Sequence, residues 1–139
     1  MITREADYGI RAVLYLAAKQ DNGRSPRIST RQLAEEMDVP YRFLRNITRK
    51  LVDAGLVTSQ RGKGGGLRLA LPREKLSLLD VLLVMDRDGV RLNECMAGDF
   101  DCPRMGICPV HKRLADIQDG LNCELASVTF DQLVADRIN

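Results

Sequence analysis

The sequence is poor in residues on which many enzymes and secreted proteins depend, with one histidine and four cysteines among 139 residues. No serine, histidine and aspartate set resembles a catalytic triad, and four cysteines are too few for a disulfide scaffold. No segment approaches the roughly 18 apolar residues of a membrane span. The N-terminus also lacks the apolar core of a signal peptide. We therefore expect a cytoplasmic protein that is neither a triad enzyme nor membrane-bound.

The charges of the chain are unevenly distributed along its length. Residues 1–76 carry 15 Lys and Arg against 8 Asp and Glu, whereas residues 77–139 carry 6 and 11. The first region therefore has a formal charge of +7 and the second a charge of −5. A strongly basic region is typical of proteins that bind nucleic acids. With 45% apolar residues, the chain can also bury a core.

Hydrophobic spacing predicts three helices in the basic region, over residues 5–19, from 29 or 30 to about 37, and over 40–54. The third helix should begin with Pro40 at its first position and bury an apolar stripe. The pattern then changes to a period of two, which predicts strands at 56–59 and 67–71 joined by a glycine-rich tip, residues 61–66. The residues expected in the stripe of the third helix are Phe43, Leu44, Ile47 and Leu51.

The acidic region is expected to contain a short helix over 78–86, irregular structure over 89–107 and a long helix from Cys108 to about Ser127. Thr129 should cap a final short helix. The fold class predicted is mainly α with a small β-hairpin wing: a winged helix-turn-helix domain (1–76) followed by a cysteine loop and a long helix (77–139). The long helix carries a narrow apolar seam of the kind that pairs helices, formed by Leu114, Ile117, Leu121 and Leu125.

In a winged helix-turn-helix, the third helix enters the major groove of DNA and the wing contacts the backbone or minor groove. Arginine and asparagine can form paired hydrogen bonds to base edges, so Arg42, Arg45 and Asn46 are the predicted base contacts. Arg49 and Lys50 are expected to meet phosphates. The full set of predicted contacts to a double-stranded DNA operator is Tyr41, Arg42, Arg45, Asn46, Arg49, Lys50, Arg61 and Lys63.

Three cysteines, Cys95, Cys102 and Cys108, fall in or beside the irregular segment. No CxxC pair is present, which disfavours a zinc ribbon, and the wide spacing suits a larger group such as an iron–sulfur cluster. Cys108 precedes Pro109 and should cap the long helix, where free N–H groups favour the thiolate that binds iron. His111, one turn later, is within reach of the same group. Cys123 lies roughly 18 Å beyond His111 along the helix and is interpreted as a bystander.

The first-helix segment Ala6–Ala12, the wing sequence Arg61–Gly66 and the three-cysteine loop together resemble the Rrf2 family of bacterial transcription regulators, the group of IscR, NsrR and CymR. The resemblance covers nearly the whole chain. It implies a homodimer paired through the long helix, with one 2Fe–2S or 4Fe–4S cluster in each subunit. Cluster state, altered by iron supply, oxygen or nitric oxide, would then set DNA affinity, as in a repressor.

The resemblance also implies roles for single residues. Cys95, Cys102 and Cys108 match the three cluster cysteines. His111 matches the fourth ligand of IscR-like members, which hold 2Fe–2S. Asp7 matches an aspartate that completes a 4Fe–4S site from the partner subunit in NsrR-like members. Both residues are present, so the fourth ligand stays open.

Two other hypotheses remain. The chain could be a winged-helix regulator with a cluster-free thiol or zinc switch, or one that senses a protein partner. It could instead be a small iron–sulfur electron carrier, for which the basic wing would have no use.

Overall fold

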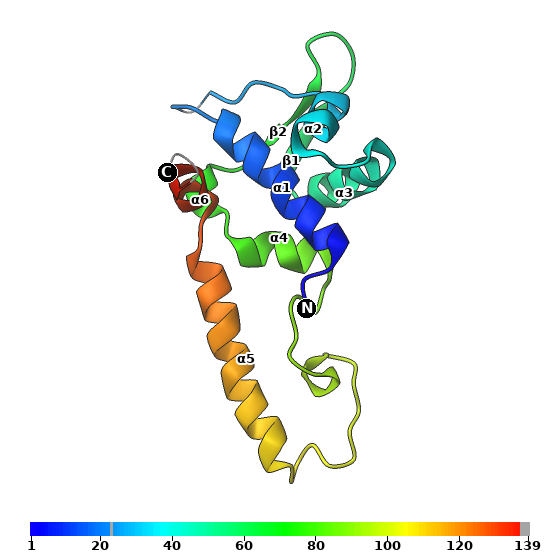
Figure 1. Ribbon diagram of the computed structural model, residues 1–139, viewed down its shortest axis with the longest axis vertical. Coiled ribbons are helices and arrows are strands. Elements are labelled where there is room, and N and C mark those ends of the chain that lie inside the picture. Colours follow the sequence, from blue (N-terminus) through cyan, green and yellow to red (C-terminus); the bar gives the residue numbers. More distant parts are fainter. Residues whose placement is uncertain (23, 137–139) are drawn as a thin grey trace.

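Helices dominate the part of the chain that the structure, a computed structural model, describes: residues 1–22 and 24–136 (Figure 1). One antiparallel hairpin follows the third helix, so the predicted fold class is confirmed. The elements are α1 (Arg4–Lys19), α2 (Thr30–Met37), α3 (Tyr41–Asp53), β1 (Val57–Gln60), β2 (Gly66–Leu69), η1 (Arg73–Lys75), α4 (Leu78–Met85), η2 (Glu94–Met96), α5 (Pro109–Ser127) and α6 (Phe130–Asp136).

Side-chain caps define where several helices begin. Thr3 accepts a hydrogen bond from the Ala6 amide at 3.1 Å, and Ser29 accepts one from the Gln32 amide at the same distance. Ser77 and Asp80 form a reciprocal capping box at the start of α4. These caps satisfy amides that have no partner inside the helix, and they explain why sequence spacing located the starts within one or two residues.

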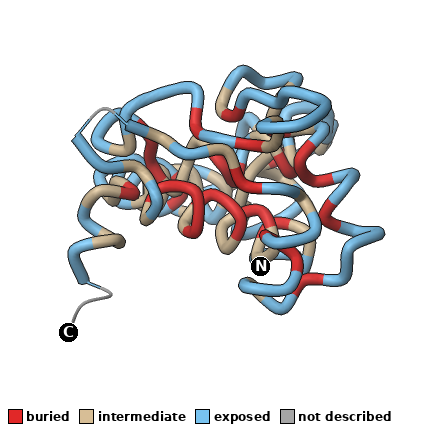
Figure 2. Tube along the Cα trace, turned by 90° about the horizontal axis from the view of Figure 1, so that it is seen from above, coloured by how far each residue is buried: buried red, intermediate tan, exposed pale blue. Residues whose placement is uncertain are grey.

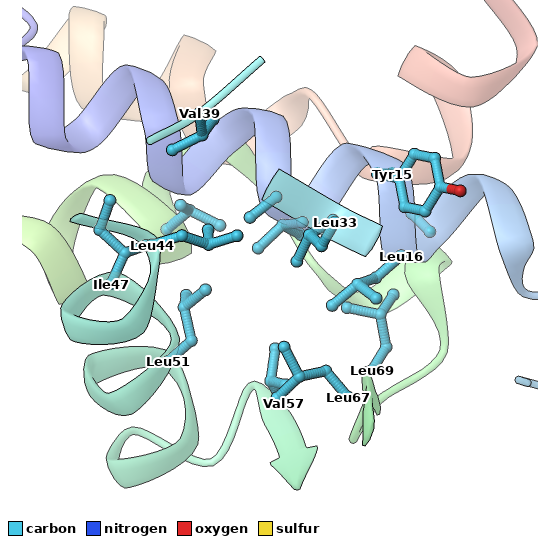
Figure 3. Close-up of a cluster of buried hydrophobic side chains, with 14 of the residues drawn as sticks. Tyr15, Leu16, Leu33, Val39, Leu44, Ile47, Leu51, Val57, Leu67 and Leu69 are labelled. Atoms are coloured by element: carbon cyan, nitrogen blue, oxygen red, sulfur yellow. The ribbon is translucent and has the colours of Figure 1, made fainter. Parts of the chain in front are cut away.

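A single hydrophobic core joins the helix-turn-helix to the wing (Figure 3). Leu16, Leu33, Leu44 and Leu51 come from three helices and are at most 1% exposed. The same core continues into the acidic region through residues of α4 and α6, so the central helix α1 is covered from several sides. Figure 2 shows the buried residues as short red segments that alternate with tan ones in the interior of the trace. The residues of the acidic region in the core are Val81, Leu82, Met85 and Phe130.

The wing is anchored to the segment that precedes α2. Its strands pair from Val57 with Leu69 to Gln60 with Gly66, and Ile28 exchanges two backbone hydrogen bonds with Leu67, at 2.7 and 2.8 Å. Gly66 has φ of +132°, and a Cβ there would lie 2.7 Å from the Ile28 carbonyl oxygen. Glycine is therefore required at this position.

Two expectations about α3 are wrong. The helix begins at Tyr41, and Pro40 is its N-cap rather than its first residue. Phe43 is 50% exposed, because the buried stripe runs through Leu44, Ile47 and Leu51 and Phe43 lies at its edge. There its ring lies 6.4 Å from the ring of Tyr8 on α1.

The cysteine loop, which we define as residues 87–107, and α5 extend away from the winged body (Figure 1). The loop leaves α4 and returns to the N-terminus of α5, with η2 as its one helical turn. Leu78 and Phe130 form backbone hydrogen bonds to Val128 and Leu76, which tie the end of α5 and the start of α6 to the body. None of the helices in the described ranges has the length and hydrophobicity that a membrane span requires.

Candidate nucleic-acid interface and cysteine site

The turn between α2 and α3 has the geometry of a helix-turn-helix. Asp38 adopts a left-handed conformation, with φ of +52°, and its amide bonds back to carbonyls of α2. The Val39 amide donates to the Ala34 carbonyl at 3.0 Å, and the Val39 side chain is buried. This tight turn packs α3 against α2 and leaves the opposite face of α3 open.

The open face of α3 carries the side chains predicted to contact DNA. Because the apolar stripe faces the core, most of the remaining positions of the helix face solvent. Lys50 differs from the other predicted DNA contacts of α3, since it is half-buried and its Nζ pairs with Glu5 Oε1 on α1 at 2.7 Å. The exposed members are Tyr41, Arg42, Arg45, Asn46 and Arg49.

A groove of about 590 Å³ separates α3 from the wing. Arg45 and Arg49 line it from the helix and Arg61 lines it from the wing. The one carboxylate among its lining residues is Asp53. Lys63 is exposed at the wing tip, beside the groove. A concave surface with this excess of arginine suits a phosphate backbone.

The structure adds residues to this surface that the sequence did not indicate. Ser29 and Thr30 at the start of α2 line the groove, as does Gln60 at the end of β1. Arg31 lies over the ring of Tyr41, with its guanidinium carbon 5.6 Å from the ring centroid. The basic character of Arg31 was a visible signal, but its position beside α3 depends on the packing of α2.

Three of the four cysteines of the acidic region line one cavity of about 250 Å³. Cys95 comes from η2, Cys102 from the following turn and Cys108 from the cap of α5, and all three are half-buried. His111, in the first turn of α5, lines the same cavity. The structure therefore brings together four side chains that span 17 positions of sequence. The remaining walls include Phe100, Met105 and Val110.

Two of the cysteine sulfurs accept hydrogen bonds from nearby N–H groups. One nitrogen of His111 has no hydrogen-bond partner in the described residues. The Cys108 Sγ accepts a hydrogen bond from the His111 amide, and the Cys95 Sγ accepts one from Asn93 Nδ2, each at 3.4 Å. His111 Nδ1 is buried and has no hydrogen-bond partner within the described residues. A buried ring nitrogen without a hydrogen-bond partner costs free energy.

Three thiols and one imidazole make up the donor set of this cavity. No group of three or more histidine, cysteine or carboxylate side chains that could hold a metal ion occurs in residues 1–22 and 24–136. The cysteines nevertheless share one cavity, and a cluster spans several ångströms and takes thiolate ligands. Soft sulfur donors with one imidazole suit iron–sulfur chemistry.

Asp7 and Cys123 lie outside this cavity. Asp7 is on α1, where its carboxylate pairs with Arg11 at 2.8 Å. Cys123 is exposed on α5, 12 positions after His111. Within this chain neither of them lines the cavity.

The apolar seam of α5 is partly open to solvent. Ile117 is 58% exposed, whereas Leu114 and Leu121 are half-buried. Leu125, near the end of the helix, packs against the core of the body. The middle of α5 thus presents apolar side chains outward while its end is held by the fold.

Comparisons with known proteins show the family and the fold of the chain. The model of the Rrf2 family, described as "Iron-dependent Transcriptional regulator", matches residues 2–136. The chain is 33% identical over 138 residues to the protein aau3 of Rhizobium meliloti, covering 98% of this chain and 86% of that protein. It is 33% identical over 135 residues to the HTH-type transcriptional repressor NsrR of Streptomyces coelicolor, covering 96% and 88%. The solved structure of IscR from T. potens superimposes with a TM-score of 0.74, at 22% identity, covering 99% of this chain and 88% of the other.

Proposed function

Because this chain belongs to the Rrf2 family of DNA-binding transcriptional regulators, we propose that an iron–sulfur cluster controls its affinity for an operator. The ligands are Cys95, Cys102 and Cys108. The observation that carries the proposal is their convergence on one cavity. The family is one of regulators rather than enzymes, so the cavity is a sensor site and not a catalytic one.

Operator recognition is assigned to α3 and the wing. Arg42, Arg45 and Asn46 on the exposed face read base edges in the major groove. Arg49 on α3, with Arg61 and Lys63 on the wing, neutralises phosphates on either side of the groove. Tyr41 is held at the N-terminus of α3 by Arg31 and contacts the backbone there. Lys50 is already paired with Glu5, so it contributes less than the other cations.

The sensor role is assigned to residues that bridge separate elements. Cys95 belongs to η2, Cys102 to the middle of the loop and Cys108 to the cap of α5. Ligands at these three places tie the loop to the N-terminus of α5. When bound, the cluster supplies iron whose redox and ligand state responds to oxygen, nitric oxide or iron supply. The three cysteines would hold the loop in place while the cluster is bound. They would leave the loop free to move once the cluster is lost.

The fourth ligand is assigned to His111. His111 lines the same cavity as the cysteines, and its buried Nδ1 has no partner in the described residues. This assignment corresponds to a 2Fe–2S cluster. Asp7 would have to arrive from a partner subunit after leaving Arg11, and it is the alternative ligand of a 4Fe–4S cluster.

The regulator is proposed to act as a homodimeric repressor. The exposed Ile117 and its neighbours on the seam pair two copies of α5, so that two α3 helices face a two-fold symmetric operator. The repressor role follows the similarity to NsrR, whose name describes a transcriptional repressor. An ordered or released loop changes the position of α5 relative to the winged body, with a coupling of about 1–3 kcal/mol.

The test is anaerobic purification of the full chain, with visible absorbance and a count of iron and acid-labile sulfide. We expect brown protein with equal amounts of iron and sulfide. Cys102→Ala should lose the visible absorbance while the winged region stays folded, and the matched control Cys123→Ala should keep it. Colourless protein that carries zinc would support a zinc switch instead, and a coloured, fully regulated Cys102→Ala protein would contradict the proposal.

A further inference from the structure

A buried glutamine in the middle of α5 connects that helix to the cysteine loop. Gln118 is 8% exposed, and both the oxygen and the nitrogen of its side-chain amide form hydrogen bonds. Oε1 accepts from the Leu92 amide at 2.9 Å, and Nε2 donates to the Val90 carbonyl at 2.7 Å. Nε2 also donates to Asn122 Oδ1 at 3.2 Å. The side chain therefore satisfies one donor and one acceptor of the loop backbone, 26 and 28 residues away in sequence.

Apart from hydrogen bonds that Asp88 and Gly89 donate to Asp86 at the end of α4, the other polar bonds of the loop are internal. Asp88 accepts from Arg91 at 2.7 Å and from the Gly98 amide at 3.3 Å. Arg87 pairs with Asp99 at 3.1 Å. Among the described residues, the bonds of Gln118 are the only hydrogen bonds between residues 87–107 and α5. The internal bonds stabilise the shape of the loop, whereas the bonds of Gln118 attach the loop to α5.

The position of Gln118 relates it to the cysteine site. Gln118 lies seven residues after His111, so the two side chains share one face of α5, two turns apart. Leu92 lies three residues before Cys95. The loop is thus held to α5 at two places: at its end by the covalent link to Cys108, and at its start by Gln118.

We propose that Gln118 is a positioning residue, a latch that holds the start of the cysteine loop against α5 and so keeps Cys95 opposite Cys108 and His111. This role rests on the proposed function for its regulatory meaning, whereas the latch itself is a property of the metal-free chain. With Val90 and Leu92 fixed, rearrangement of residues 93–107 acts on the middle of α5, the part that carries the dimer seam. Without the latch, the loop moves independently of the helix.

The first test measures hydrogen exchange in the metal-free full chain. In the native protein the Leu92 amide should be protected relative to an exposed loop amide such as that of Asp101. Gln118→Met keeps the length of the side chain but removes both of its hydrogen bonds to the loop backbone, those to Leu92 and Val90. We expect Leu92 exchange to become at least about ten-fold faster, because the Leu92 amide loses the partner that protects it from solvent. Amides of α1 and α3 should be unchanged, as should the matched control Asp119→Asn, an exposed position on the same helix.

Two further readouts separate positioning from general stability. In metal-free Gln118→Met, alkylation of Cys95 should accelerate relative to that of the exposed Cys123. After anaerobic reconstitution, the variant should release iron to a chelator faster and show a changed visible spectrum at an unchanged thermal midpoint. A loss of thermal stability with no change in Cys95 alkylation would overturn the positioning role.

The outcomes of this proposal and of the proposed function are distinguishable. A Leu92 amide that exchanges as fast as Asp101 in the native chain overturns the latch, and this result does not depend on whether any variant folds. Protected Leu92 in a chain that takes up no iron supports the latch and contradicts the cluster.

Discussion

Arg45 and Lys50 lie on the same helix but differ in what they can offer to DNA. Arg45 is exposed on the open face and forms no ion pair within the described residues, whereas Lys50 is held by Glu5 at 2.7 Å. Arg45→Ala should weaken binding by about 1–3 kcal/mol, mainly through loss of preference at one base pair. Competition binding with single-base operator variants at fixed salt measures this, with Lys50→Ala as the comparison. Equal weakening on every sequence would show that Arg45 does not read a base.

Single residues show both the reach and the limits of sequence reasoning. The outward cations of α3 were predictable, because a helical period with one buried stripe fixes which side chains face solvent. Phe43 was wrongly expected in the core because an aromatic residue at the edge of a stripe can turn either way. Gln118 was not identified at all. Its signal was a polar residue one turn after Leu114, beside the apolar seam, but its partners in the loop depend on tertiary packing.

At the scale of elements, α4 links the winged body to the cysteine loop and depends on its cap. Ser77 is 8% exposed and bonds to Asp80 through both its amide and its hydroxyl. Ser77→Ala should lower the free energy of unfolding by about 1 kcal/mol and Tm by about 2–4 °C. Thermal unfolding followed by circular dichroism checks this. Ser127→Ala, an exposed serine at the end of α5, should change Tm by less than half as much.

The wing should contribute charge rather than sequence preference. Arg61 lines the groove beside α3 and Lys63 is exposed at the tip. Replacing either with alanine should weaken binding to all DNA and reduce the slope of log affinity against log salt by about 1. Titrations at several salt concentrations measure the slope. Lys75→Ala, an exposed cation in η1, serves as the control, and a slope as steep as that of the native protein in both wing variants would rule out phosphate contacts there.

The elements themselves were largely predictable from caps and periodicity, since Thr3, Ser29, Ser77 and Cys108 all cap the helices that follow them. The meeting of the cysteines was a hypothesis from spacing and chemistry. Local pattern could not establish it, because an irregular loop is placed by distant contacts such as those of Gln118 with Val90 and Leu92.

On the scale of the whole molecule, the acidic region is packed on the basic one rather than merely tethered to it. Phe130 of α6 is fully buried in the shared core, and Met85 of α4 packs against Gly9 of α1. A change in the cysteine loop therefore reaches a body whose helices share one core. This continuity would give the proposed sensor a physical route to α3, which packs on α1.

Dimer formation is expected to depend on the exposed part of α5. Ile117 is 58% exposed in the single chain, so a charge at this position would disturb little of its fold but would oppose pairing of two seams. Ile117→Asp should shift the protein from dimer to monomer in sedimentation velocity experiments and weaken operator binding. Asp116→Asn, on a neighbouring exposed position, should remain dimeric. A native chain that sediments as a monomer at all concentrations would contradict the proposal that two chains pair through this seam.

Occupancy of the cysteine cavity is proposed to set operator affinity. The most direct measurement is an anaerobic fluorescence anisotropy titration of one fragment from the gene's own upstream region, with iron-loaded and iron-stripped protein at the same salt. We predict affinities that differ by about 5- to 150-fold, with the difference abolished in Cys102→Ala. Equal affinities for the loaded and stripped native protein would contradict the account.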